Sequence, residues 1–133
     1  MHEYAHWQTS SLLRRLAKAA SKTARSSSED AVHDLRVAIR RMRCCLVLFA
    51  RFYPSGGRKD LKKVLKHMMG ACGEVRDRDI ALELLLAAGV PRASVAARRL
   101  MAGRKDAGRD LRDALKPWKG ARLQREWRAR LEL

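Results

Sequence analysis

The sequence predicts an all-α protein, an up-and-down bundle of four main helices plus a short C-terminal helix. Helix-forming residues dominate the 133 positions, and no segment alternates apolar and polar residues with a period of two. Four short breaker segments, at residues 26–28, 54–57, 89–91 and 117–120, divide the chain into helix-sized pieces. Because short connections place consecutive helices side by side and antiparallel, we expect a single domain over residues 1–133.

The first helix precedes the serine run and has an apolar stripe that includes Leu12, Leu13 and Leu16. The segment is also rich in Arg, Lys, Ser and Ala, as organelle transit peptides are. An ordinary helix is the better interpretation, because the stripe leads directly into a capped second helix. Ser26, followed three residues later by Glu29, predicts the capping box that begins this second helix.

The second helix has the clearest apolar seam of the chain. Its members are spaced alternately by three and four residues, a pattern typical of a helix in a bundle. They are Val32, Leu35, Ile39, Met42, Leu46, Phe49 and Tyr53. Pro54 cannot continue the helix and is expected to end it.

Three further helices follow. The third is expected from about Arg58 to Ala88, with the seam Leu61, Leu65, Met68, Cys72, Val75 and Leu82. The fourth begins with Pro91 near its first turn, and its seam, Ala97, Leu100, Ala107, Leu111 and Leu115, is interrupted at Gly103-Arg104. The last is a short segment with Leu123, Trp127 and Leu131 at four-residue spacing.

The charge balance indicates a polyanionic partner. Lys and Arg number 30 against 14 Asp and Glu, a formal net charge of +16. No apolar run approaches the roughly 18 residues of a membrane span, so we expect no membrane association. Three cysteines with an adjacent pair are no disulfide framework, which favours a reducing, cytoplasmic location.

On the second helix the basic residues are segregated. At about 100° per residue, one arc that lies roughly 110° from the seam contains no acid and includes His33, Arg36, Arg40 and Arg43. His33 offers an N–H donor to a phosphate, although a helix-surface histidine bonded to a neighbour fits its position equally well. Arginine suits phosphate because its planar fork holds two oxygens at once.

The third helix has a matching basic stripe, Lys62, Lys66 and Arg76, displaced from its seam by a similar angle in the same sense. In an antiparallel pair, two stripes displaced in the same sense lie on the same side. We therefore expect the two stripes to merge into one basic surface. Gly73 shares the stripe and would let a ligand approach the backbone closely.

The fourth helix repeats this segregation. Its three aspartates gather on one face, and another face without an acid contains Lys105, Arg109, Arg112 and Lys116. A run of charge is often only a solvated helix surface. Segregation on three helices favours anion binding instead.

Asp79 is an exception because it projects into the apolar seam of the third helix. An inward carboxylate needs a cationic partner, and Arg76 or an arginine of the second helix is the expected one. Asp79 would then position binding arginines without touching the anion. The alternative is a bend near Gly73 that places Asp79 in solvent.

Signals of an enzyme or a metal site are absent. There is no phosphate-binding glycine loop with its lysine and no Cys/His ligand spacing. Asp77 and Asp79 diverge by about 160° on a helix and cannot share one ion. We therefore expect a non-catalytic protein without a metal or cofactor.

Two other functions stay open from composition and charge. A nucleic-acid-binding module fits the charge, but aromatics make up only 5% of the chain, and Trp118 and Trp127 are the candidates for base stacking. A scaffold that docks an acidic protein is the third possibility.

Two motifs resemble the CHAD domain, the conserved histidine α-helical domain of prokaryotes. The second helix reads His33-x-x-Arg36-x-x-x-Arg40-Arg41-x-Arg43, and the third reads Gly73-x-x-Arg76-Asp77-x-Asp79-Ile80. The order and spacing of both motifs match over residues 29–88, the motif core. The resemblance implies a helical bundle that binds inorganic polyphosphate without catalysis, through His33, Arg36, Arg40, Arg43 and Arg76, and a place at polyphosphate granules.

The length differs from the family pattern. CHAD domains resemble two related four-helix halves around a basic cavity, and this chain corresponds to one half of such a double bundle. A bundle of half size leaves an apolar flank uncovered, and symmetric pairing is the commonest remedy. We therefore expect a homodimer.

Overall fold

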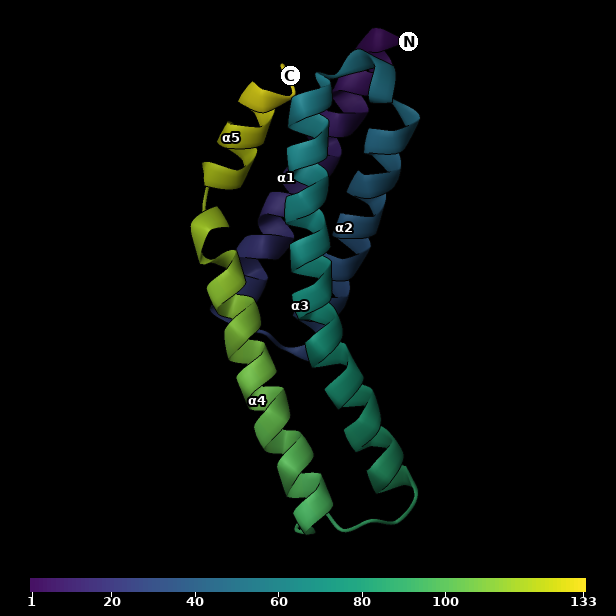
Figure 1. The fold of residues 1–133 in the computed structure, drawn as a ribbon, viewed down its shortest axis with the longest axis vertical. Helices are drawn as coiled ribbons and strands as arrows, with labels where there is room; N and C mark the ends of the chain where they lie inside the picture. Colours follow the sequence, from purple (N-terminus) through teal and green to yellow (C-terminus); the bar gives the residue numbers. More distant parts are fainter.

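The computed structural model describes residues 1–133 and consists of five α-helices and two short 3-10 helices, without strands. In chain order these are α1 (His2–Arg25), α2 (Glu29–Leu48), η1 (Ala50–Phe52), α3 (Ser55–Ala87), α4 (Val95–Leu115), η2 (Lys116–Trp118) and α5 (Arg122–Arg130). The all-α prediction is confirmed. Figure 1 shows α1 to α4 as an up-and-down bundle, and α5 continues beyond α4 toward the end where the chain termini lie, in contact with α1.

One continuous apolar core joins the helices. The predicted seams of α1, α2 and the first half of α3 are all buried in it, with Leu13, Leu35 and Leu65 fully inaccessible. α5 completes the core through Trp127, which is 1% exposed. Each fully buried large side chain stabilises the fold by about 1.5–3 kcal/mol, so α5 is an integral part of the bundle.

The beginning of α2 differs from the prediction. Ser28, not Ser26, is the N-cap, and its Oγ accepts a hydrogen bond of 3.2 Å from the Ala31 amide. Ser27 is buried and accepts hydrogen bonds from two arginines of α4, so Ser26 and Ser27 form the connection instead. With the cap at Ser28, the acidic Glu29 falls in the first turn, where the helix dipole favours it.

The other boundaries shift by a few residues. α2 ends at Leu48, and Phe49 and Tyr53 are buried beyond it around η1. Tyr53 is held there because its hydroxyl donates to the Ala5 carbonyl oxygen at 2.9 Å. α4 begins at Val95 with a Ser94 cap, later than Pro91 suggested.

α4 is one continuous helix through Gly103-Arg104, the position where its apolar seam was predicted to be interrupted. A Cβ added at Gly103 would lie 3.1 Å from Nε of Arg78 on α3. The glycine therefore lets α3 and α4 approach closely. The Arg104 side chain turns inward, which explains why the apolar seam breaks at this position.

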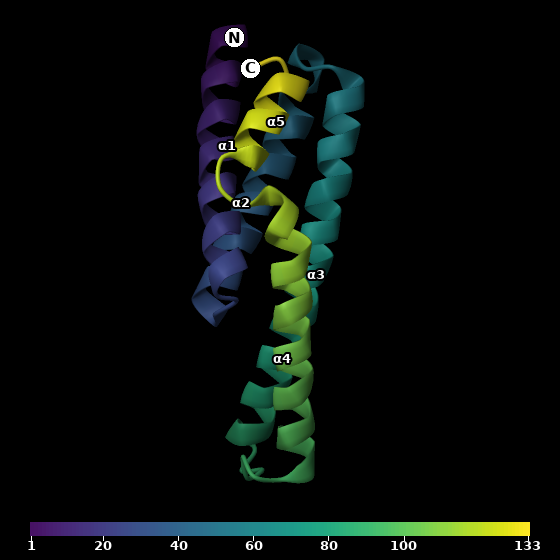
Figure 2. The ribbon, with the colours of Figure 1, turned by 90° about the vertical axis from the view of Figure 1, so that its left-hand side faces the viewer.

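The end of α1 and the beginning of α2 meet at the serine turn, residues 26–28. α3 and α4 extend as a pair well beyond this turn. Figures 1 and 2 show this two-helix arm from perpendicular directions, with the chain termini together at the opposite end of the molecule. We define the arm as residues 80–97, with the connecting turn at its tip. No residue of α3 beyond Val75 is buried.

Two glycines of α3 predict opposite effects of an alanine substitution. A Cβ at Gly57 would overlap the Arg130 carbonyl oxygen of α5, whereas a Cβ at Gly73 meets nothing within 4 Å. We expect Gly57→Ala to lower the free energy of unfolding by about 1–3 kcal/mol, because overpacking displaces α5. Gly73→Ala should raise it by about 0.5–1 kcal/mol, because alanine is the better helix former. Urea denaturation of both variants measures the two changes.

Candidate functional site: a basic face and a basic groove

The basic face consists of the α2 residues His33, Arg36, Arg40 and Arg43 and the α3 residues Lys62, Lys66 and Arg76. α2 and α3 are adjacent and antiparallel. At the end of the pair nearest the arm, Arg76 of α3 reaches across to Glu29 of α2. The apolar seams on either side, buried from Val32 to Leu46 and from Leu61 to Val75, hold the two helices in this orientation. The basic face therefore has a fixed helical backbone, from which long side chains extend their cationic groups.

Arg36 is the most enclosed cation of the basic face. Its Nε is buried without a hydrogen-bond partner, and its charge acts on the buried Cys72 thiol of α3. Burial raises the pKa of the Cys72 thiol to about 12, and the positive charge of Arg36 opposes that rise. A buried donor without a partner is costly, and an anion at this position would supply the missing acceptor.

Five cations of the basic face make no ion pair within the chain. They are Arg36, Arg40, Arg43, Lys62 and Lys66. The expectation that no acid shares the arc is wrong at the first turn of α2. Glu29 lies there and binds Arg76 at 3.1 Å, so the basic face is partly neutralised at the end nearest the arm. The pair is largely exposed and contributes little to stability.

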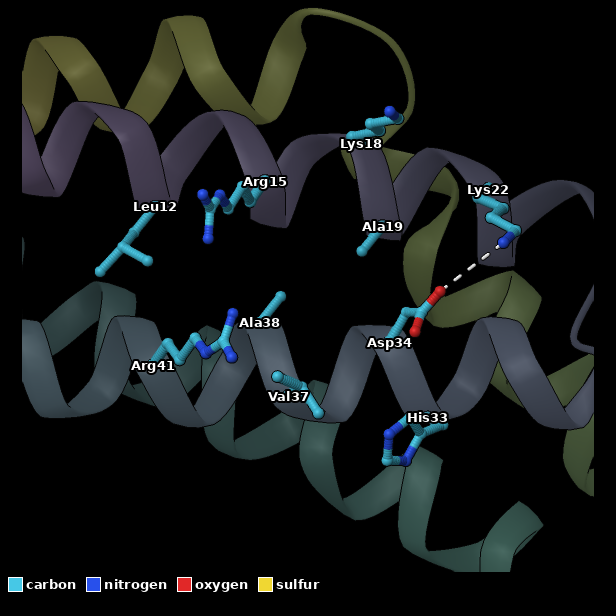
Figure 3. Close-up of a pocket in the computed structure, with 10 residues that line it drawn as sticks. All are labelled: Leu12, Arg15, Lys18, Ala19, Lys22, His33, Asp34, Val37, Ala38 and Arg41. Carbon is cyan, nitrogen blue, oxygen red and sulfur yellow. Dashed lines mark ion pairs between the residues drawn. The ribbon is translucent and has the colours of Figure 1, made fainter.

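A second basic site lies on the other side of α2, in a groove of about 570 Å³ between α1 and α2. Its cations are Arg15, Lys18 and Lys22 of α1 and Arg41 of α2, and one acid, Asp34, pairs with Lys22 at 3.6 Å. Figure 3 shows the guanidinium groups of Arg15 and Arg41 pointing toward each other across the groove. No acid separates these two like charges, which makes the gap favourable for an anion.

Sequence reasoning missed this α1–α2 groove. A signal was present, because Arg15, Lys18 and Lys22 recur at spacings of three and four and form one stripe of α1. His33 is exposed and lines the edge of the groove, but it turns away from Arg15 and Arg41 in Figure 3. It therefore lies between the groove and the basic face.

The structure does not bring the predicted α4 residues into the basic face. α4 packs on α1 and on the flank of α3 that is turned away from α2. Arg112 donates to Oγ of Ser27 at 2.6 Å, and with Lys105 it lines a separate hollow of about 500 Å³ at the serine turn. These two residues are thus close to the beginning of α2 without joining its stripe.

The remaining two α4 cations are paired, which corrects the prediction of an acid-free face. Arg109 binds Asp106 at 3.1 Å, and Lys116 binds Asp113 at 2.8 Å, both between exposed side chains. The hydrogen bond and charge of Lys116 lower the pKa of the Asp113 carboxyl below its usual value. Residues three apart on a helix reach each other easily, so the aspartates neutralise the stripe beside them.

Asp79 points inward as predicted, but its partner is different. Its Oδ1 accepts a hydrogen bond of 3.0 Å from Nε of Arg104 on α4, and neither Arg76 nor a residue of α2 contacts it. Arg104 also donates to the Ser27 carbonyl oxygen at 2.5 Å. The pair therefore joins α3, α4 and the α1–α2 connection and does not position the cations of the basic face.

The aromatic candidates for base stacking also differ from the prediction. Trp127 is buried and Trp118 packs beside it with ring centroids 5.7 Å apart, so neither offers a free ring. The exposed aromatics are Tyr4 and Trp7 at the beginning of α1, 56% and 62% exposed. Tyr4 lies against Phe49, which places both rings at the terminal end of the bundle.

The fold and these surfaces define an all-α module with a strongly basic exterior formed by neighbouring helices. No helix is both long and apolar enough to cross a membrane. A family model described as the CHAD domain matches residues 8–133, and the chain belongs to this family. The match extends well beyond the two motifs, over essentially the whole chain. No curated protein and no solved structure matches the chain significantly.

Proposed function

We infer that the chain is a non-catalytic module that binds inorganic polyphosphate on the basic face of α2 and α3. The CHAD family is associated with polyphosphate in general. The observation that supports this site most strongly is the set of five cations without an acid partner on two adjacent helices. Such a surface favours a linear ligand with one charge per repeat.

The chemistry of the basic face suits phosphate oxygens in particular. Arg36, Arg40 and Arg43 provide planar forks that bind two oxygens each, and Lys62 and Lys66 provide point charges on flexible stems. His33 adds an N–H donor at the edge of the α1–α2 groove. With Arg15 and Arg41 in that groove, a long chain has a second set of cations on the other side of α2.

A chain bound across two helices and a groove would contact many phosphates at once. Because each neutralised phosphate releases counterions, the affinity should fall steeply with salt. The same dependence holds for DNA, so salt alone does not identify the ligand. Competition between the two polyanions does.

The decisive experiment is competition at physiological salt between labelled long-chain polyphosphate and duplex or single-stranded DNA at equal phosphate concentration. We expect neither DNA to displace polyphosphate; for the single strand the reason is that the basic face presents no aromatic ring on which a base could stack. Displacement by either DNA would contradict polyphosphate as the preferred ligand. Fluorescence anisotropy of the labelled polyphosphate measures its displacement by each DNA.

Single-stranded nucleic acid is the second candidate because Tyr4 and Trp7 are exposed on a strongly basic protein. Stacking on exposed rings contributes about 1–3 kcal/mol per base. If single-stranded DNA displaces polyphosphate, the Trp7→Ala variant should no longer show this displacement. If Trp7→Ala has no effect on the displacement, the rings are not the binding surface.

The proposed assembly is a homodimer, because the chain is half the size of the double bundle that the resemblance implies. Two basic faces in one particle would engage one long chain together. Linked binding of this kind raises the apparent affinity without a new contact.

A further inference from the structure

We propose that the arm at the end of α3 and α4 is a self-association surface, whose partner is the arm of a second copy of this chain. This rests on the homodimer of the proposed function and identifies its interface. Figures 1 and 2 show that α1 and α2 cover the bundle only up to the serine turn. Beyond this turn, α3 and α4 pack only against each other.

The α3 side of the arm is apolar but not buried. Seven of the eight residues from Ile80 to Ala87 are apolar, and none of them is buried. Leu84 is 65% exposed and Val95 66% exposed. Ile80 is also exposed, while Leu82 and Leu86 are only partly covered. Large apolar side chains exposed close together on one helix pair are typical of an interaction site.

The charge of the arm indicates which partner fits. Two copies that each have a net charge of +16 repel each other over most of their surface. Residues 80–97 contain only one acid, Glu83, and one base, Arg92, and are therefore neutral. The arm is thus a place where two copies can meet without bringing like charges together, and an acidic protein would find no complementary charge there.

A second apolar patch does not share this property. Val47 and Leu48 near the end of α2 are 65% and 73% exposed, but they surround a hollow together with Arg40 and Arg43. A symmetric contact through this patch would place those arginines against their own copies. Self-association is therefore disfavoured there, and the patch provides a matched control.

Pairing through the arm has a consequence for the ligand. Gly73, Arg76, Ile80 and Leu84 follow one another at spacings of three and four, so the apolar flank of the arm continues the α3 side of the basic face. Two arms packed by a two-fold axis would therefore join two basic faces in one particle, with the neutral arms between them. A long polyphosphate chain could then span both.

Light scattering after gel filtration tests this with Leu84→Glu and the control Leu48→Glu, each of which places a carboxylate at an exposed leucine. We expect the wild type and Leu48→Glu to have twice the 15.1 kDa mass of one chain and Leu84→Glu to have the mass of one chain. Ile80→Glu should act like Leu84→Glu, and circular dichroism verifies that all variants are folded. A wild type with the mass of one chain, or a dimeric Leu84→Glu, would overturn the interface.

Binding measurements separate this inference from the proposed function. Leu84→Glu should lose about tenfold or more in affinity for long polyphosphate but keep its affinity for a short oligophosphate that fits one basic face. A monomeric wild type that still binds polyphosphate would refute the homodimer and its arm interface and leave the polyphosphate site standing. A wild type that is dimeric through the arm but binds no polyphosphate would refute the proposed function alone.

Discussion

Replacing both Arg36 and Arg40 by glutamine is expected to weaken polyphosphate binding on the order of 100-fold at physiological salt. Each arginine–phosphate contact contributes about 1.5–3 kcal/mol in the absence of competing ions, and screening reduces this to about 1.4 kcal/mol, or tenfold, per contact. Glutamine removes the charge and keeps much of the stem that packs on α3. Anisotropy titrations at several salt concentrations give both the affinity and its salt dependence.

The matched control for this experiment is the double replacement of Arg99 and Arg125 by glutamine. Both side chains are exposed, and they belong to α4 and α5, outside the basic face. Arg41 is unsuitable as a control because it lines the α1–α2 groove. The Arg36/Arg40 variant should also lower the slope of log affinity against log salt by about two, one for each lost contact. Equal losses of polyphosphate affinity in both double variants would mean that binding depends on the total charge of the protein and not on the basic face.

Replacing Asp79 by alanine is expected to lower the free energy of unfolding by about 3 kcal/mol. Asp79 and Arg104 are only 13% and 22% exposed, and breaking such a pair leaves one charge without a partner. The loss of one partner of a fully buried pair costs about 3–5 kcal/mol, and the residual solvent contact here places the value at the lower end. Urea denaturation measures the change.

The Asp106→Ala variant is the control, because the exposed Arg109–Asp106 pair should contribute less than about 1 kcal/mol. The double variant Asp79→Leu/Arg104→Met should recover most of the lost stability, since it leaves no uncompensated charge. Polyphosphate affinity of folded Asp79→Ala should stay within about twofold of the wild type. A large loss of affinity at full folding would mean that Asp79 does position the binding cations.

The helical period predicted the parts of the fold that depend on one helix at a time. The seams of α2 and of the first half of α3 follow the three-four spacing because core residues must share one stripe. For the same reason the outward placement of Arg40 and Lys66 could be read from the sequence. The merging of both stripes into one surface rests on the antiparallel pairing of α2 and α3 and stays a prediction.

Contacts that involve a third helix could not be predicted from the helical period. The partner of Asp79 comes from α4, and helical projection does not reveal which neighbour covers which flank. The cap at Ser28 depends on Ser27, which is occupied by Arg104 and Arg112 of that same helix. Arg109 and Lys116 pair with Asp106 and Asp113, which helical projection assigns to a different face of the fourth helix. Projection did not predict these pairs, because it ignores the length of side chains that reach each other over three residues.

Mapping polyphosphate onto the folded chain by the shifts of its backbone amide resonances tests the central claim most directly. With polyphosphate at physiological salt, we predict that the largest shifts fall between His33 and Arg43 and between Lys62 and Arg76. Smaller shifts are expected around Arg15 in the α1–α2 groove. Shifts concentrated in α4 and α5, or spread evenly over all the basic residues, would contradict a binding site on the basic face.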